Sequence, residues 1–132
     1  MSTFLQDKCY ETANTYAACI EFRFDENHRR AFNASQLIEF SLDPNPAAAD
    51  DKNEPPLKIT LVFSTADVVV LGWRLGLIAD YLRGNTLTAV CILPKRYAEL
   101  ERNAIYISSI TIKPVSKYKC HWRRNLMTTN RP

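Results

Sequence analysis

Three segments alternate apolar and polar side chains with a period of two residues: 19–24 (CIEFRF), 37–42 (LIEFSL) and 57–64 (LKITLVFS). Because successive side chains of a β-strand point to opposite faces, this alternation predicts strands with one buried face. The predicted inward set is Ile20, Phe22, Phe24, Ile38, Phe40, Leu42, Leu57, Ile59, Leu61 and Phe63. Such a chain is expected to form a β-sheet with one face packed against a hydrophobic core.

Three further segments predict strands. Residues 68–71 and 87–93 (LTAVCIL) are almost entirely apolar, which is typical of strands at the centre of a sheet. Segment 104–113 carries isoleucines on one parity before Ser108-Ser109 and on the other parity after it. An extra residue there would return all of them to one face, so we expect a β-bulge at Ser108-Ser109.

The sequence predicts three helices, two from helical spacing and one from the position of a proline. Thr3 and Gln6 fit a capping box, and the apolar spacing after them favours an N-terminal helix at about 3–17. The main helix, at about 73–83, would place four side chains on the sheet and end at Gly84: Leu75, Ile78, Ala79 and Leu82. Pro94 suits the start of a short helix near 95–102.

The order of these elements predicts an α+β fold. We expect a mostly antiparallel sheet of five to seven strands with its helices on one face, in a single domain over 1–113. Residues 114–132 would form a basic C-terminal segment, either an edge strand or a tail. The four prolines of the 43–56 connection predict an exposed hairpin loop that neither packs nor pairs. The alternative is a parallel α/β arrangement around 68–93.

The main helix carries an apolar flank beside its core stripe. Trp73, Leu77 and Tyr81 recur at every fourth position, and together they would offer about 500 Å² of apolar surface. Either the N-terminal helix or the segment 114–132 covers this flank, or it is a protein interface. The sequence thus predicts a non-enzymatic binding or assembly module that meets another chain at this flank, most simply as a homodimer.

Charge is distributed unevenly along the chain. Residues 1–101 carry 10 Lys/Arg against 14 Asp/Glu, a net charge of −4, whereas residues 102–132 carry seven basic residues and no acidic one. The stretch 116–124 (SKYKCHWRR) alternates aromatic residues or cysteine with cations. Such a row either guards an edge strand against aggregation or contacts nucleic acid. The nucleic-acid alternative would use Lys117, Lys119, His121, Trp122, Arg123 and Arg124.

A phosphate-binding loop is a weaker interpretation of the 72–76 junction (GWRLG). Gly72 and Gly76 fit neither the P-loop nor the dinucleotide-binding spacing, and apolar Leu77 and Ile78 stand where phosphate contacts are needed. Gly72 is therefore interpreted as a turn between a strand and a helix.

The sequence shows no recognisable catalytic arrangement. His28 lies in a charged turn and His121 among cations, while the carboxylates Asp67, Glu99 and Glu101 and the Ser64-Thr65 pair suit surface and turn positions. A zinc site built from Cys9, Cys19, Cys120 and His121 would lack the short spacings of such sites. We therefore expect no cofactor and no metal, and an enzyme with an unrecognised site is the second alternative.

The segments that direct a chain to a membrane are not evident. The N-terminus lacks a basic start followed by an apolar run, and no stretch approaches about 18 apolar residues. The four cysteines show no CxxC spacing. We expect a soluble cytoplasmic protein without a membrane partner.

Overall fold

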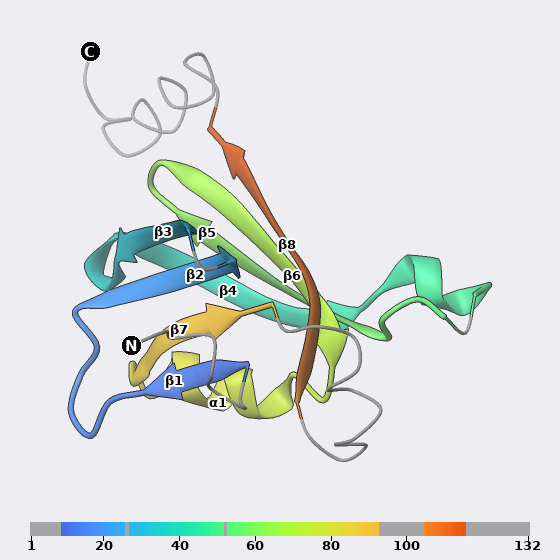
Figure 1. The fold of residues 1–132 in the computed structure, drawn as a ribbon, viewed down its shortest axis with the longest axis horizontal. Helices are drawn as coiled ribbons and strands as arrows, with labels where there is room; N and C mark the ends of the chain where they lie inside the picture. The colour runs from blue at the N-terminus through green and yellow to red at the C-terminus, as the bar shows by residue number, and fades with distance from the viewer. Residues whose placement is uncertain (1–8, 26, 52, 93–104, 116–132) are drawn as a thin grey trace, which may run out of the picture.

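The computed structural model describes residues 9–25, 27–51, 53–92 and 105–115, which form a mixed α+β fold of two four-stranded sheets and one α-helix (Figure 1). The strands are β1 (Tyr10–Thr12), β2 (Cys19–Asp25), β3 (His28–Asn33), β4 (Leu37–Pro44), β5 (Leu57–Phe63), β6 (Ala66–Trp73), β7 (Leu87–Cys91) and β8 (Tyr106–Pro114). The helix is α1 (Gly76–Arg83), and the short 3₁₀ helices are η2 (Ala34–Gln36) and η3 (Pro46–Ala49).

The strands divide between two sheets instead of the single larger sheet that was predicted. The first sheet has the order β1-β7-β2-β3, and its β2–β7 pair is parallel while its other pairs are antiparallel. The second sheet, β4-β5-β6-β8, is antiparallel throughout. Because β6 and β7 lie in different sheets, the alternative parallel unit around 68–93 is wrong.

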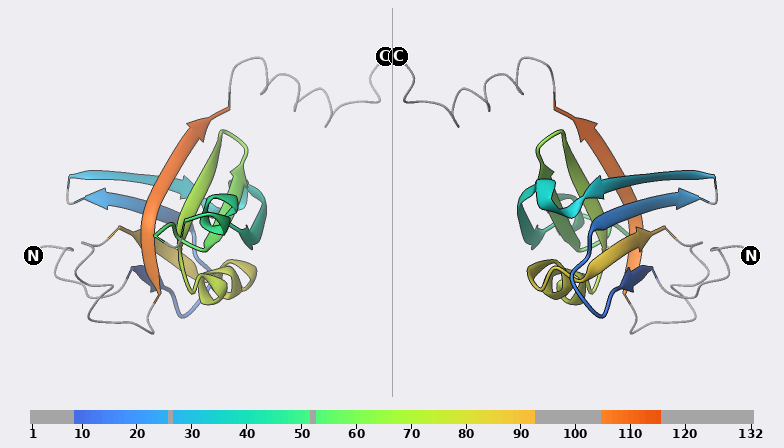
Figure 2. Two further views of the ribbon diagram at one scale, coloured as in Figure 1. Left: turned by 90° about the vertical axis from the view of Figure 1, so that its right-hand side faces the viewer. Right: turned by 90° about the vertical axis from the view of Figure 1, so that its left-hand side faces the viewer.

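The core lies between the two sheets, and α1 packs at one end of it (Figures 1 and 2). Phe63 from β5 stacks on Phe32 from β3 with ring centroids 4.5 Å apart, and it meets Phe22 from β2 edge to face. Ile78 and Leu82 are the buried residues of α1. Aromatic contacts that join strands of both sheets hold the layers together.

The alternation of β5 is confirmed, whereas that of β4 is confirmed only in part. Ile59, Leu61 and Phe63 are buried, as predicted. On β4, Ile38 is 55% exposed although it was predicted to point inward, and Leu42 lies opposite buried Ile59 on the predicted face but is still 38% exposed. The register of β4 shifts between Leu37 and Glu39, so Ile38 is the unpaired residue of a bulge.

The predicted helix at 3–17 is wrong where the structure describes it. Residues 10–12 form β1, which pairs with β7, and the following loop is held by a hydrogen bond from the Ala13 amide to the Thr86 carbonyl (2.8 Å). Pairing with a distant strand therefore overrides the local helical spacing. Residues 3–8 and the predicted helix near 95–102 lie outside the described residues.

The main helix begins three residues later than predicted. Trp73 is still part of β6, and the chain turns at Arg74, whose φ is +58°. Gly72 is therefore a residue of β6 and not the turn between strand and helix, which corrects the interpretation from the sequence.

The bulge in β8 is confirmed. Ser109 is opposite Leu71 and Ile107 is opposite Gly72, which leaves Ser108 as the extra residue. As a result, Ile107 and Ile110 are both buried, and Ile105 and Ile112 pack against the same core.

The 45–56 connection packs on itself, contrary to the expectation of a loop without pairing. Asn45 is buried, its side-chain amide donates to the Pro55 carbonyl (2.7 Å), and its backbone amide donates to the Pro56 carbonyl (2.9 Å). These bonds close the base of the connection, which projects from the body of the protein beyond β4 (Figure 1).

Candidate functional site

The predicted interface residues do not lie on one helix. Trp73 ends β6, where its ring lies against Tyr106 of β8 with centroids 5.4 Å apart. Tyr81 on α1 stacks on Tyr10 of β1 at 5.5 Å. Of the three predicted residues, Leu77 alone is exposed, with 42% of its surface accessible. Two rings of the expected flank are thus partly covered within the chain, by strands instead of the predicted N-terminal helix.

Exposed apolar surface is found instead on β4. The large apolar residues with the most exposed side chains in the described ranges are Tyr16, Ile38, Leu42 and Leu77, and two of these four are on this strand. Among the described strands, β4 pairs with β5 alone, so it is an edge strand of the second sheet within the described residues, and α1 contacts it. Apolar side chains on a free edge are an unusual combination, because edge strands generally carry charges that prevent pairing.

The face of β4 that points away from the core is acidic. The side chains of Glu39 and Asp43 are exposed and form no ion pair with any other described residue. Asp50, Asp51 and Glu54 follow in the connection after β4, and Lys52 is the only basic residue between 37 and 56. This part of the chain therefore has a net charge of −4. The edge presents hydrogen-bonding backbone, apolar side chains and negative charge together.

The cations of the nucleic-acid alternative lie outside the described residues. Lys117, Lys119, His121, Trp122, Arg123 and Arg124 all follow Val115, the last described residue. Their contact with nucleic acid therefore stays a prediction.

The described catalytic candidates are spread over the fold. His28 starts β3 and stacks on Phe24 at 4.7 Å, whereas Asp67 lies on β6 of the other sheet, opposite Lys113. The Ser64 hydroxyl donates to the Gln36 side chain at the end of β5. No group of three potential metal ligands occurs in ranges 9–25, 27–51, 53–92 and 105–115. His121, Glu99 and Glu101, and the zinc candidate Cys120, fall outside them.

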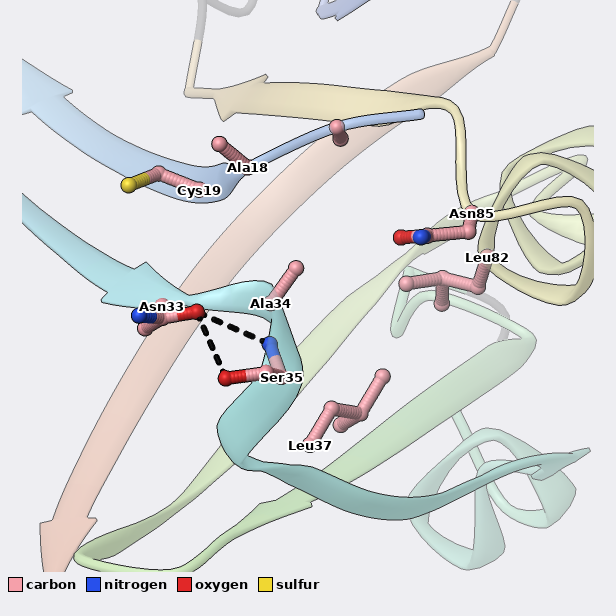
Figure 3. Close-up of a pocket in the computed structure, with 9 residues that line it drawn as sticks. Ala18, Cys19, Asn33, Ala34, Ser35, Leu37, Leu82 and Asn85 are labelled. Carbon is pink, nitrogen blue, oxygen red and sulfur yellow. Dashed lines mark hydrogen bonds between the residues drawn. The ribbon is translucent and has the colours of Figure 1, made fainter. Parts of the chain in front are cut away.

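An open pocket of about 450 Å³ lies where β2, β3 and β4 approach the end of α1 (Figure 3). It is lined by Ala17, Ala18, Cys19, Asn33, Ala34, Ser35, Leu37, Leu82 and Asn85. The side-chain oxygen of Asn33 already accepts hydrogen bonds from the Ser35 amide (3.0 Å) and hydroxyl (2.8 Å), which hold the local turn. The lining has no Asp, Glu, His, Lys or Arg, and its one ionisable side chain is the exposed thiol of Cys19.

Arg23 organises a polar cluster on the outer side of the first sheet, and sequence analysis missed it. Its guanidinium donates to Glu11 (2.9 Å), to Glu21 and to the Cys91 sulfur (3.8 Å). Burial raises the pKa of Cys91 to about 11, although Arg23 opposes this rise. Glu21 is two residues from Arg23 on β2, but Glu11 and Cys91 lie on other strands, so no short spacing in the sequence could have revealed the whole cluster. The cluster joins β1, β2 and β7 and leaves the thiol protonated, which suits a structural role.

The comparisons with known proteins add no relative. The chain matched no protein family, no curated protein and no solved structure. No helix of the described residues is long and apolar enough to cross a membrane.

Proposed function

We propose that this protein is a non-enzymatic binding and assembly module that associates with itself through the free edge of β4. The observation that carries the proposal is the exposure of Ile38 (55%) and Leu42 (38%) on a strand whose outer edge pairs with no other described strand. The strand has eight residues, and its regular part, Glu39–Asp43, spans about 14 Å, which is enough for several backbone hydrogen bonds with an incoming strand.

Strand addition provides both affinity and selectivity. Backbone hydrogen bonds hold the incoming strand, while side chains at alternate positions select its sequence. The bulge at Ile38 and the missing amide hydrogen of Pro44 restrict regular pairing to Glu39–Asp43. A short edge of this kind favours a defined partner segment over unlimited sheet growth.

The helix flank is the second candidate contact surface. Leu77 is exposed to almost the same extent as Leu42. Its apolar side chain is therefore also in contact with water in a free subunit, and a partner could bury it. Trp73 and Tyr81 differ, because each already packs on an aromatic ring of its own chain. We also infer a reducing cytoplasmic setting, which the free thiols of Cys9, Cys19 and Cys91 support.

Two matched leucine substitutions test the proposal. Leu42→Lys adds a charge to the β4 edge, and Leu77→Lys adds the same charge at a similarly exposed site on α1. We expect light scattering to show that Leu42→Lys lowers the molar mass of the assembly while Leu77→Lys leaves it unchanged. Circular dichroism should report a folded protein in both cases.

Other outcomes would contradict the proposal. A wild-type protein that is monomeric at all concentrations would refute self-association. An assembly that dissociates with Leu77→Lys but not with Leu42→Lys would assign the interface to the helix flank.

A further inference from the structure

The β4 edge and the C-terminal segment have matching side-chain patterns. On β4, Phe40 and Leu42 share the inward parity, while Glu39, Ser41 and Asp43 share the outward parity. In the C-terminal segment, Tyr118, Cys120 and Trp122 alternate with Lys117, Lys119, His121 and Arg123. When two strands pair, residues of matching parity share a face. Apolar residues would therefore meet apolar ones, and cations would meet carboxylates.

The spacing of the charges also agrees. Glu39 and Asp43 are four residues apart, as are Lys119 and Arg123, so each pair would span about 14 Å in a strand. Both carboxylates can meet both cations whether the strands run parallel or antiparallel. In either direction, Trp122 would lie beside Phe40 or Leu42.

We propose that the occupant of the β4 edge is the segment 117–123 of a second copy of this chain. Residues 37–56 carry a net charge of −4, and residues 116–132 carry five Lys/Arg and no acidic residue. Attraction between these parts would bring two copies together, and strand addition would fix their register. This inference rests on the proposed self-association and names the segment responsible for it.

The position of Val115 explains why the segment comes from another copy. The Val115 amide donates to the Thr65 carbonyl (3.0 Å), so the described chain ends beside the β5–β6 turn (Figure 1). A strand added at the outer edge of β4 would lie four strand spacings from β8, about 19 Å. The four steps from Val115 to Lys119 span at most about 14 Å, so Lys119 of the same chain cannot reach that edge.

A reciprocal exchange closes the assembly. If each copy gives its C-terminal segment to the other, both edges are filled and the two contacts are identical. The expected assembly is therefore a dimer and not an open chain of subunits.

Charge reversal in the 132-residue chain tests the pairing. The β4 variant is Glu39→Lys with Asp43→Lys, and the segment variant is Lys119→Glu with Arg123→Glu. Each should weaken the dimer tenfold or more, since an exposed ion pair contributes up to about fivefold and reversal also adds repulsion. The protein that carries all four changes should recover most of the affinity, measured by sedimentation or light scattering at low salt.

A single substitution provides the matched control. Arg124→Glu makes the same charge change one residue beyond Arg123, on the parity of the aromatic residues. It should weaken the dimer less than Arg123→Glu does. Equal effects of the two substitutions would indicate attraction without a defined register and would overturn the strand pairing.

The possible results separate this inference from the proposed function. If Leu42→Lys dissociates the assembly but the segment variant does not, self-association through β4 stands and the C-terminal segment is not the occupant. If the segment variant leaves the dimer intact and instead abolishes salt-sensitive binding of a labelled oligonucleotide, the segment is a nucleic-acid contact and the inference is wrong.

Discussion

Gly72→Ala provides a sharp test of how the second sheet is built. Gly72 lies within β6 and faces β8, with Ile107 as its partner. A Cβ atom at this position would lie 2.2 Å from the Tyr106 carbonyl oxygen, 3.1 Å from the Ile107 Cα and 3.2 Å from the Leu75 Cδ2. The first contact is with backbone, which cannot rotate away as a flexible side chain can. The added methyl group therefore forces β8 away from β6.

The size of the effect follows from this contact. An ordinary contact of a Cβ atom is about 3.4 Å or longer, so β8 must move by about 1 Å where it pairs with β6. Overpacking of a well-packed site costs about 1 to 3 kcal/mol, and displaced backbone adds to this. We expect Gly72→Ala to lower the free energy of unfolding by about 3 kcal/mol. At a urea m-value of about 2 kcal/mol/M, the midpoint would fall by about 1.5 M.

Gly76→Ala is the control for this experiment. Gly76 is the first residue of α1, and a Cβ atom there would meet nothing within 4 Å. Alanine is the better helix former, so the substitution should raise the free energy of unfolding by up to about 1 kcal/mol. Urea unfolding followed by circular dichroism compares both variants with the wild type. A Gly72→Ala protein as stable as Gly76→Ala would refute the close approach of β6 and β8.

Three further substitutions test the packing. Trp73→Ser should cost about 2 kcal/mol in unfolding free energy, because it removes the contact with Tyr106, and light scattering should show an unchanged molar mass. Leu82→Asp places a carboxyl group at a site only 6% exposed, and the cost of about 4 kcal/mol or more should abolish the near-ultraviolet circular dichroism of the folded protein. The pKa of the Cys91 thiol is about 9 in the unfolded chain and is raised to about 11 in the folded protein. Between these pH values only the unfolded state loses the proton, so the folded state loses stability as the pH rises from about 9 to about 11. Relative to Cys91→Ala, the unfolding free energy should fall by about 3 kcal/mol over this range, and parallel pH profiles would contradict the burial of the thiol.

Local periodicity predicted the strands well, because a strand with one buried face alternates apolar and polar side chains at neighbouring positions. The alternation of β5 and the bulge at Ser108 were both readable, since each depends on the parity of side chains within a few positions. The N-terminal helix failed for the opposite reason. Residues 10–12 became a strand because β7, almost 80 positions later, offers them an edge. Local spacing carries no information about such a partner.

The candidate site at the β4 edge could be predicted only in part, because it too depends on contacts between distant parts of the chain. The aromatic and cationic pattern after Ser116 is visible in the sequence, but the exposure of Ile38 and Leu42 depends on the bulge in β4 and on its place at the edge. The division of the strands between two sheets decides which strands have free edges. Periodicity within single strands cannot determine that division.

Two of the four end strands of the described sheets, β3 and β4, carry opposite charge. β3 ends the first sheet and exposes His28, Arg29 and Arg30, whereas β4 ends the second and exposes Glu39 and Asp43. Cations on an edge strand repel an incoming strand of the same charge. In the proposed pairing, the cations of β3 would repel the basic C-terminal segment and the carboxylates of β4 would attract it, so the two charged edges together would select β4 as its site.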